Sequence, residues 1–454
     1  MFATGVIRGD TAFVIGPDKP ARQLVRVSTT DPAVAEDRDP RYAWVVVAVV
    51  AVTLTMASGA RFLFGVVLKP MSEEFGWNRA QLTGTVMLAM IVLSICQPLV
   101  GMLIDRIGAK SILVGGIALL GVSLIPLSFA TNLWQIYVLY GVLTSFGLAA
   151  ASPVLATSIV SRWFTHKRGL AMSLATSGSA FGQLLIVPIA TWIMLATSWQ
   201  TTYHVLAVAL LAVAVPLSAI FLRDAPREMV AAGRDLPPED GLTLREACAH
   251  PAFWILGFGF VVCGWTMAFP NIHFLAYADD MGMSVLHAAS TVSVTAIFSI
   301  LGAVLLGLAA DRFQRTSVLA LTYALRGLAF LLLLLLPAGN LLYVYGLVLG
   351  ISWTATTPLT AAIAADRYGP KHLGLIFGSL FTFMNLGFGF ASLLDGLIFE
   401  VSGGYQVTLM INVVLGVVAA IAAALVPYFG HERQRRQLPL GAPERGSVPA
   451  RATG

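Results

Sequence analysis

Charged residues are scarce in this sequence. Asp, Glu, Lys and Arg make up 11 % of its 454 residues, whereas 57 % of the residues are hydrophobic. A soluble domain carries about 25 % charged residues, because its surface must face water. The length alone would allow two or three soluble domains, but there are too few polar residues to cover them. The solvent of this protein must therefore be largely lipid.

The chain also lacks the motifs that other classes of protein need. Its three cysteines, Cys96, Cys248 and Cys263, have no metal-ligand spacing and imply no disulfide framework. The sequence has no phosphate-binding loop, no paired carboxylates in a loop, no histidine cluster and no nucleophile elbow. A basic patch interleaved with aromatic residues is absent as well. We therefore expect no enzyme, no cofactor, no metal and no nucleic-acid partner.

What the chain does have is twelve long apolar runs. About 20 apolar residues in a helix cross the hydrocarbon core of a bilayer, and a helix bonds its own backbone groups where lipid cannot. The predicted spans are Tyr42–Leu68, Ala80–Ile104, Ser111–Phe129, Leu133–Val160, Gly169–Ala196, Thr201–Leu222, Ala252–Ala276, Leu286–Ala310, Ser317–Leu336, Leu341–Ala365, His372–Phe399 and Tyr405–Tyr428. We predict an all-α membrane protein with twelve transmembrane helices.

The basic residues favour one orientation of these spans. If the amino terminus lies in the cytoplasm, the side opposite the cytoplasm holds only Lys69 and Arg79, and the remaining connections hold many Lys and Arg residues. Cytoplasmic loops of membrane proteins carry an excess of Lys and Arg. We therefore expect both termini in the cytoplasm and the protein in a plasma membrane, which in bacteria is the inner membrane.

One long polar connection divides the spans into six and six. We expect residues 42–222 and 252–428 to form two halves, and residues 223–251 to form a cytoplasmic linker with a short amphipathic helix at Leu242–Ala249. The composition of residues 1–41 and 429–454 is typical of disordered tails. Because one chain holds both halves of a complete path, we expect a monomer to function.

The two halves repeat each other at a distance of 206 residues. Gly76 corresponds to Gly282 (282 − 76) and Asp105 to Asp311 (311 − 105), and the register between these pairs holds without a gap. A match over a whole span and both flanking turns indicates duplication. Carriers built from such repeats hold their substrate at the repeat interface, near the middle of the membrane.

Each half carries a Gly-x-x-x-Asp-Arg turn. The residues are Gly101, Asp105, Arg106 and Gly108 in the first half and Gly307, Asp311 and Arg312 in the second. Glycine lets two helices approach closely, and an aspartate can accept bonds from a helix N-terminus. The alternative is that these turns only supply positive-inside charge. The turns resemble the signature loop of the major facilitator superfamily, and the resemblance covers nearly the whole chain. It implies two pseudo-symmetric six-helix halves (the major facilitator fold) and a cytoplasmic latch between them.

A second resemblance points to one branch of that superfamily. The segment Trp163–Gly182 is similar to the fifth-helix signature of the monocarboxylate porter family. Its Gly178-x-x-x-Gly182 pattern alone is typical of close helix packing, which we favour for these two residues. The similarity implies a bacterial monocarboxylate-porter-like symporter of a carboxylate and a proton. In that family an Asp and an Arg of the eighth span bind proton and substrate, but Ser299 and Ala303 stand at those positions here.

Arg61 is therefore the candidate anion-binding residue. A charge in the middle of the membrane costs about 2.5 kcal/mol or more, so its presence needs a reason. Arg61 lies well inside the first span, and the first helix lines the central cavity in the family that the chain resembles. A guanidinium group there would bind a carboxylate through two hydrogen bonds. The alternatives are a structural pair or a side chain that snorkels to the surface.

Polar and aromatic residues of other spans complete the candidate lining. The predicted substrate-binding set also contains Trp265, Asn271, His273, Trp353, Thr357 and Asn385. Such a lining suits a partly apolar organic ligand with a few polar anchors. Packing between helices is the alternative for each of them, and for His273 the alternative is a bonded position at a helix end.

Three further charges lie within spans. Asp395 and Glu400, near the outer end of the eleventh span, are candidates for proton coupling, with helix capping or pairing as the alternative. Arg326 lies in the ninth span, which is peripheral in the fold that the resemblance implies, so we predict a structural or snorkelling role for it.

Three functions follow from these observations. The first is a secondary transporter that moves a small organic anion with a proton by alternating access. The second is export of amphipathic drugs or uptake of a vitamin-like aromatic solute, which the uncharged eighth span favours. The third is a membrane sensor that transports nothing.

Overall fold

The structure is a computed structural model that describes residues 41–164, 168–224, 241–335, 339, 341–369 and 372–429. Within the helices, the side chains of residues 98, 101, 102, 104–106, 161, 168 and 169 are not described. The described residues form helices and turns, with no strand among them. The predicted tails fall almost wholly outside this part of the chain, as does most of the predicted linker.

Twelve helices in the described residues are long and apolar enough to cross a membrane, which confirms the predicted number. The first six spans comprise α1 (Arg41–Phe75), α2 (Arg79–Ile107), α3 (Ala109–Leu127), α4 to α6 (Leu133–Ile136, Ser145–Ala150, Pro153–Ser161), α7 to α9 (Arg168–Thr176, Gly178–Phe181, Val187–Ala196), and α10 with α11 (Trp199–Ala209, Val215–Phe221). The last six comprise α14 with α15 (Pro251–Ala268, Phe274–Asp280), α16 (Val285–Arg312), α17 (Arg315–Leu335), α18 with α19 (Leu341–Trp353, Thr356–Tyr368), α20 (Leu373–Ser402) and α21 (Gln406–Leu425).

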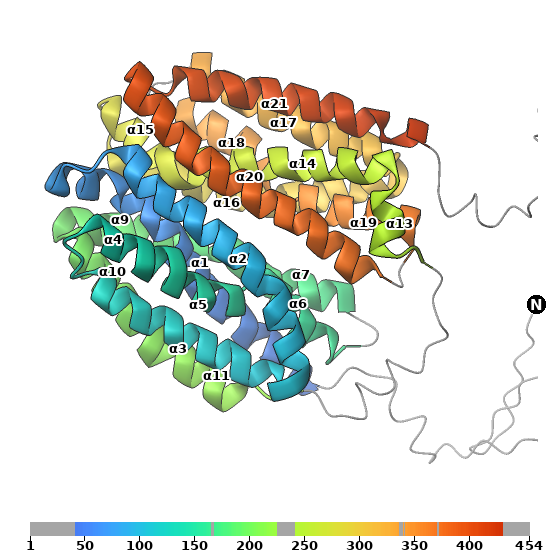
Figure 1. Cartoon of the computed structure of the whole chain (residues 1–454), viewed down its shortest axis with the longest axis horizontal. Coiled ribbons are helices and arrows are strands. Elements are labelled where there is room, and N and C mark those ends of the chain that lie inside the picture. Colours follow the sequence, from blue (N-terminus) through green and yellow to red (C-terminus); the bar gives the residue numbers. More distant parts are fainter. Residues whose placement is uncertain are drawn as a thin grey trace, which may run out of the picture.

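The spans form two bundles of six, and Figure 1 shows the first bundle, in blue and green, beside the second, in yellow to red. We call the end of the molecule where α1 ends and α2 begins the distal end, on the left in Figure 1. The opposite end, where α1 begins and α21 ends, is the terminal end. The predicted short helix of the linker is present as α13 (Leu244–Cys248), which lies at the terminal end.

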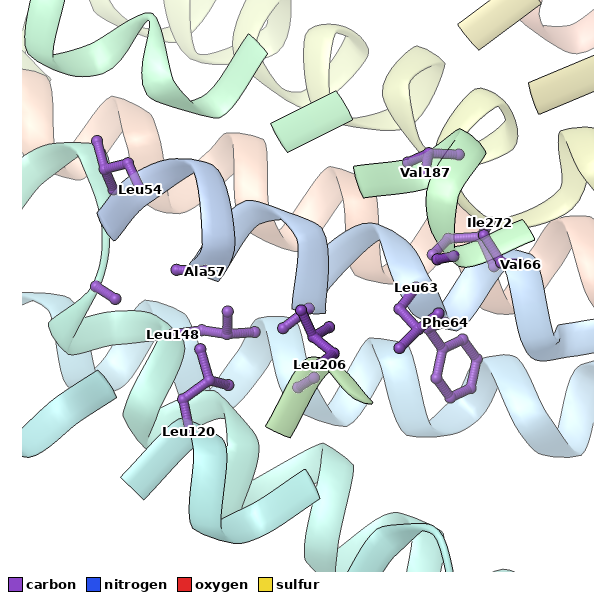
Figure 2. Packing of buried hydrophobic residues seen from close by; sticks show 14 of the residues in the cluster. Leu54, Ala57, Leu63, Phe64, Val66, Leu120, Leu148, Val187, Leu206 and Ile272 are labelled. Carbon is purple, nitrogen blue, oxygen red and sulfur yellow. The ribbon is translucent and has the colours of Figure 1, made fainter. Parts of the chain in front are cut away.

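Helix α1 lies at the centre of the first bundle. Figure 2 shows Leu54, Ala57 and Leu63 of α1 surrounded by apolar side chains of other helices, among them Leu120 of α3 and Leu206 of α10. In lipid, apolar side chains gain little by leaving their solvent, so close packing carries much of the attraction between helices.

The predicted Gly178-x-x-x-Gly182 packing site is confirmed. A Cβ atom at Gly178 would lie 2.2 Å from the carbonyl oxygen of Ala51, and one at Gly182 would lie 2.5 Å from that of Thr55. Both glycines therefore let the fifth span lie directly against the backbone of α1.

The two bundles meet through α1, α2, α16 and α20. A Cβ atom at Gly65 of α1 would lie 2.1 Å from the carbonyl oxygen of Asn271, in the π-helical turn Phe269–His273 that joins α14 to α15. The Ser293 hydroxyl of α16 donates to the carbonyl oxygen of Leu184 in the fifth span at 2.9 Å. A Cβ atom at Gly396 of α20 would lie 3.0 Å from atoms of Ala80 in α2. Backbones of opposite halves therefore touch in the distal part of the molecule.

Candidate functional site

Arg61 lies at the boundary between the two halves. Its Nη2 atom is 3.8 Å from the sulfur of Met90 in α2, and its Cζ atom is 5.2 Å from the ring centre of Phe388 in α20. The Tyr140 hydroxyl of the fourth span donates to the Arg61 carbonyl oxygen at 3.3 Å. Within the described part of the chain, the Arg61 guanidinium makes no ion pair. Among the described residues, this partly buried positive charge thus contacts a sulfur atom and an aromatic face, both weak partners for a cation.

The seventh span brings two polar side chains to the same boundary region, Trp265 on α14 and Asn271 in the π-helical turn Phe269–His273. Its Gly264 touches α20, since a Cβ atom there would lie 1.9 Å from the Met384 carbonyl oxygen and 2.9 Å from the Phe388 nitrogen. Trp265 follows directly, and its Nε1 atom is buried with no hydrogen-bond partner among the described residues. Asn271 donates from Nδ2 to the Met267 carbonyl oxygen at 2.6 Å, but its Oδ1 atom is buried without a described partner. A donor and an acceptor are thus both unused on this span.

Asn385 of α20 is buried and bonded across the boundary. Its Nδ2 atom lies 3.3 Å from Oε1 of Gln97 in α2. Arg61 and Asn385 therefore lie along the contacts of α1 and α2 with α20, and the seventh span, which carries Trp265 and Asn271, packs against α20 and α1 beside them.

Two further predicted lining residues, Trp353 and Thr357, lie at a break in the tenth span. Helix α18 ends at Trp353 and α19 begins at Thr356. Trp353 is buried, and Thr357 is partly buried. Thr354, between the two helices, donates to the Ser299 carbonyl oxygen of α16 at 2.7 Å. Interrupted helices within a membrane are tolerated where protein partners bond the freed backbone groups.

Arg326 of α17 bonds to the residues on both sides of this break. Its Nη2 atom donates to the carbonyl oxygens of Ser352 at 2.6 Å and Trp353 at 3.1 Å, while Nη1 contacts Cys263 Sγ at 3.1 Å. The side chain is fully buried. This geometry agrees with the structural role predicted for Arg326 and disagrees with snorkelling.

His273 occupies a bonded position. Its Nε2 atom lies 2.9 Å from the Ser392 carbonyl oxygen, and its Nδ1 atom lies 2.9 Å from the Tyr405 hydroxyl. Since a carbonyl oxygen only accepts, Nε2 must carry the proton, and in a neutral ring Nδ1 accepts from Tyr405. Both ring nitrogens are used and the side chain is fully buried, so we leave His273 out of the proposed substrate site.

The two acidic residues of α20 differ in their surroundings. Glu400 is exposed, and its Oε1 atom accepts from the backbone nitrogen of Arg79, the first residue of α2, at 2.9 Å. This is the capping alternative, and it leaves Glu400 outside our proposed coupling site. Asp395 is buried beside Thr408 of α21, and its Oδ2 atom has no hydrogen-bond partner among the described residues.

The predicted latch turns are only partly described. The side chains of Gly101, Asp105 and Arg106 lie outside the described residues. Gly108 has a φ of 86° and precedes α3, where Asp224 Oδ1 accepts from the Lys110 backbone nitrogen at 3.0 Å. Asp224, from the end of the sixth span, therefore caps α3, a role that the sequence analysis missed.

The second turn does not form a close contact in this structure. Gly307, Asp311 and Arg312 are exposed, and a Cβ atom at Gly307 would meet no described atom within 4 Å. The prediction that Gly307 lets a second helix approach closely is therefore wrong for this conformation. The reason is that no described atom packs against α16 at this glycine. Arg315 instead pairs with Asp366 of the same half.

The fold and the boundary site define a polytopic membrane protein in which an arginine without an ion pair among the described residues lies between two six-helix halves. The family model described as Major Facilitator Superfamily matches residues 50–289 and 254–452 in two overlapping parts. The chain belongs to this superfamily, and it is a transporter rather than an enzyme, as predicted.

The curated relatives are a mixed set of transporters that includes monocarboxylate transporters. The chain is 26 % identical over 412 residues to the uncharacterized MFS-type transporter YcxA of Bacillus subtilis, covering 87 % of this chain and 98 % of that protein. It is 25 % identical to monocarboxylate transporter 13 of Rattus norvegicus, covering 83 % and 87 %. It is 27 % identical to the gallate transporter of Pseudomonas putida, covering 84 % and 90 %.

A solved structure has the same fold. The bacterial homologue of the human lysosomal transporter Spinster, in an inward-facing and unoccupied conformation, matches with a TM-score of 0.68 at 16 % identity. The match covers 86 % of this chain and 98 % of that one. This likeness shows the fold alone.

Several residues of the site were not predicted from the sequence. Gln97 is the one amide between Leu82 and Ile104 in the apolar run of the second span, and that contrast could have identified it. Met90, Tyr140 and Phe388 are ordinary residues of apolar spans, so no local signal distinguishes them. Their role depends only on their position around Arg61.

Proposed function

We propose that the protein is a secondary transporter of a small organic anion whose carboxylate binds Arg61. The observation that supports this proposal is the Arg61 guanidinium between Met90 of one half and Phe388 of the other, with no ion pair among the described residues. A carboxylate would supply the missing negative charge through two hydrogen bonds. A ligand that touches both halves binds the closed and open arrangements differently, and this difference is what shifts a conformational equilibrium.

Two further atoms suit the same ligand. Trp265 Nε1 can only donate and Asn271 Oδ1 can only accept, and both are buried without described partners. Because an unsatisfied buried polar group costs roughly 1–3 kcal/mol, a ligand that bonds either atom gains affinity. We therefore expect a substrate that carries a polar group besides its carboxylate.

Coupling and orientation complete the proposal. Asp395 is the candidate for proton coupling, because its carboxyl group is buried and one of its oxygens is unpartnered among the described residues. We place the terminal end, with both termini, in the cytoplasm of a plasma membrane, because the short connections at that end carry most of the Lys and Arg residues. A single chain would suffice for transport.

A second candidate function is transport of an amphipathic aromatic solute, by uptake or export. The face of Phe388 and the sulfur of Met90 beside Arg61 would both pack against an aromatic ring. The relative described as a gallate transporter supports an aromatic acid as one such solute. Counterflow with labelled aliphatic and aromatic acids, together with growth tests on toxic amphipathic compounds, separates the two candidates.

The test of the anion site is Arg61→Gln in the purified protein. A carboxylate that binds the folded wild type at 100 times its dissociation constant should stabilise it by about 2.7 kcal/mol, seen as a higher melting temperature. Arg61→Gln should lose this stabilisation and the counterflow of the same acid in proteoliposomes. Arg315→Gln, which removes an exposed arginine outside the site, is the matched control and should retain both. Wild-type stabilisation and counterflow in Arg61→Gln would refute the site.

A further inference from the structure

Four charged residues join the two halves at the distal end. Lys69 of α1 contacts Asp279 Oδ2 at 2.6 Å and Asp280 Oδ1 at 3.0 Å, both at the end of α15. Arg79 of α2 donates from Nη2 to Asp280 Oδ1 at 2.9 Å and pairs through Nη1 with the other oxygen. We call Lys69, Arg79, Asp279 and Asp280 the distal clasp. Both cations come from the first half and both carboxylates from the second.

Arg79 is also held by a directed chain of hydrogen bonds in the second half. Its Nη1 atom donates to the Tyr405 hydroxyl at 2.9 Å, Tyr405 donates to His273, and His273 donates to the Ser392 carbonyl oxygen. The guanidinium Cζ atom also lies 3.9 Å from the ring centre of Phe399. Arg79 itself is buried, with 6 % of its surface exposed. An arginine of one half is therefore inserted into a polar pocket of the other.

The duplication shows where this pocket comes from. At the same offset of 206 residues, Asp280 corresponds to Glu74 (280 − 74) and Tyr405 to Trp199 (405 − 199). In the first half the two counterparts bond directly, since Trp199 Nε1 donates to Glu74 Oε2 at 2.6 Å. In the second half the shorter Asp280 and Tyr405 both bond to Arg79 instead.

The arrangement is not reciprocal. The positions that correspond to Lys69 and Arg79 in the second half are Leu275 (275 − 69) and Val285 (285 − 79), which carry no charge. His273 likewise corresponds to Val67 (273 − 67). The bond between Trp199 and Glu74 stays within the first half. The corresponding residues of the second half, Tyr405 and Asp280, instead bond to Arg79 of the first half.

We propose that the distal clasp is the gate that closes the distal mouth, with Arg79 as its central residue. This inference rests on the proposed transport by alternating access, since the two halves must separate at this end in part of the cycle. Separation breaks every bond of the clasp at once, because among the described residues the four side chains bond only across the boundary, apart from Lys69, which is also 3.8 Å from Glu73. Removing one partner of a buried charge pair leaves the other charge uncompensated, so a neutralised clasp favours the open distal end.

The experiment measures conformation in the full-length protein without substrate, so it does not depend on the anion site. Spin labels at Thr197 and Val401, both exposed at the distal end, report the distance between the halves there. A second pair at Leu170 and Leu375 reports the terminal end. Native cysteines are replaced by serine or alanine, and distances are recorded by pulsed electron resonance in lipid nanodiscs. Asp280→Asn is the test variant, and Glu74→Gln is the matched control, because its partners lie within one half.

Asp280→Asn should raise the ratio of distal-open to distal-closed molecules at least about tenfold over wild type, with shorter distances at the terminal end. Glu74→Gln should leave both distances as in wild type. Lys69→Gln, which removes a partly exposed partner, should shift the ratio in the same direction and provides the test if Asp280→Asn does not fold. Unchanged distances in the folded clasp variants, or an equal shift in Glu74→Gln, would overturn the proposal. Loss of carboxylate binding alone would bear on Arg61 and leave the gate intact.

Discussion

The guanidinium of Arg326 lies 2.6 Å from the carbonyl oxygen of Ser352, across the gap between α17 and the end of α18. The same Nη2 atom also reaches the Trp353 carbonyl oxygen and the Thr356 hydroxyl, both at 3.1 Å. The two carbonyl oxygens belong to the last two residues of α18, at the break in the tenth span, and the hydroxyl belongs to the first residue of α19. A charged side chain within the membrane is thus explained by the backbone that it bonds.

Arg326→Gln should therefore destabilise the protein. The shorter amide cannot bond both carbonyl oxygens, and hydrogen bonds to charged groups contribute roughly 1.5–3 kcal/mol each, so we expect a loss of about 2 kcal/mol or more. The measurement is the melting temperature of the purified protein in detergent. Arg315→Gln removes an exposed ion pair with Asp366, for which about 1 kcal/mol or less is expected. Equal melting temperatures for the two variants would contradict the role assigned to Arg326.

Trp265→Phe tests the unused donor of α14. Phenylalanine keeps part of the aromatic ring system but removes Nε1, which has no hydrogen-bond partner among the described residues. The free energy of unfolding should therefore fall by no more than about 1 kcal/mol, and the melting temperature should change little. Affinity for the carboxylate that stabilises wild type should drop roughly 2- to 13-fold, the effect of one lost hydrogen bond of about 0.5–1.5 kcal/mol. The dissociation constant is obtained by titrating the thermal shift. Unchanged affinity would show that Nε1 does not contact the ligand.

Gly65→Ala tests the closest backbone contact between the halves. A Cβ atom at Gly65 would lie 2.1 Å from the Asn271 carbonyl oxygen, which the distal-closed structure cannot accept without a shift. We expect a larger distance between labels at Thr197 and Val401, and a lower counterflow rate. Gly378→Ala is the control, because a Cβ atom there meets no described atom within 4 Å. In that helix, alanine should stabilise by roughly 0.5–1 kcal/mol. A wild-type label distance in Gly65→Ala would contradict this prediction.

The number of spans and the duplication could be predicted because both depend on local sequence. Each span must bond its own backbone in lipid, so the length of an apolar run reports it directly. The match of Gly76 with Gly282 and of Asp105 with Asp311 needs no knowledge of contacts. For Arg326 a structural or snorkelling role was predicted from the peripheral place of its span in the fold that the resemblance implies, and the structure agrees with the structural role.

The partners of the polar residues could not be predicted in this way. Asn385 and Gln97 are 288 residues apart in the sequence, and only the packing of α20 on α2 places them at 3.3 Å. His273 was included in the substrate lining, but the fold turns it toward Tyr405, 132 residues later. Lys69 and Arg79 were read only as charges that indicate orientation, because nothing near them in sequence identifies Asp280 as their partner.

The sequence by itself determined that this protein is a twelve-helix membrane transporter built from two related halves. Hydrophobic length, positive charge and an internal repeat are properties of single segments, so each one is visible without a fold. Only the tertiary structure decided that Arg61 is left without an ion pair among the described residues while Arg79 is held by Asp280 and Tyr405. The reason is that charged side chains pair only where the packing of the helices places them within bonding distance. That placement depends on how each helix is rotated about its axis and on the level in the membrane at which the two halves touch.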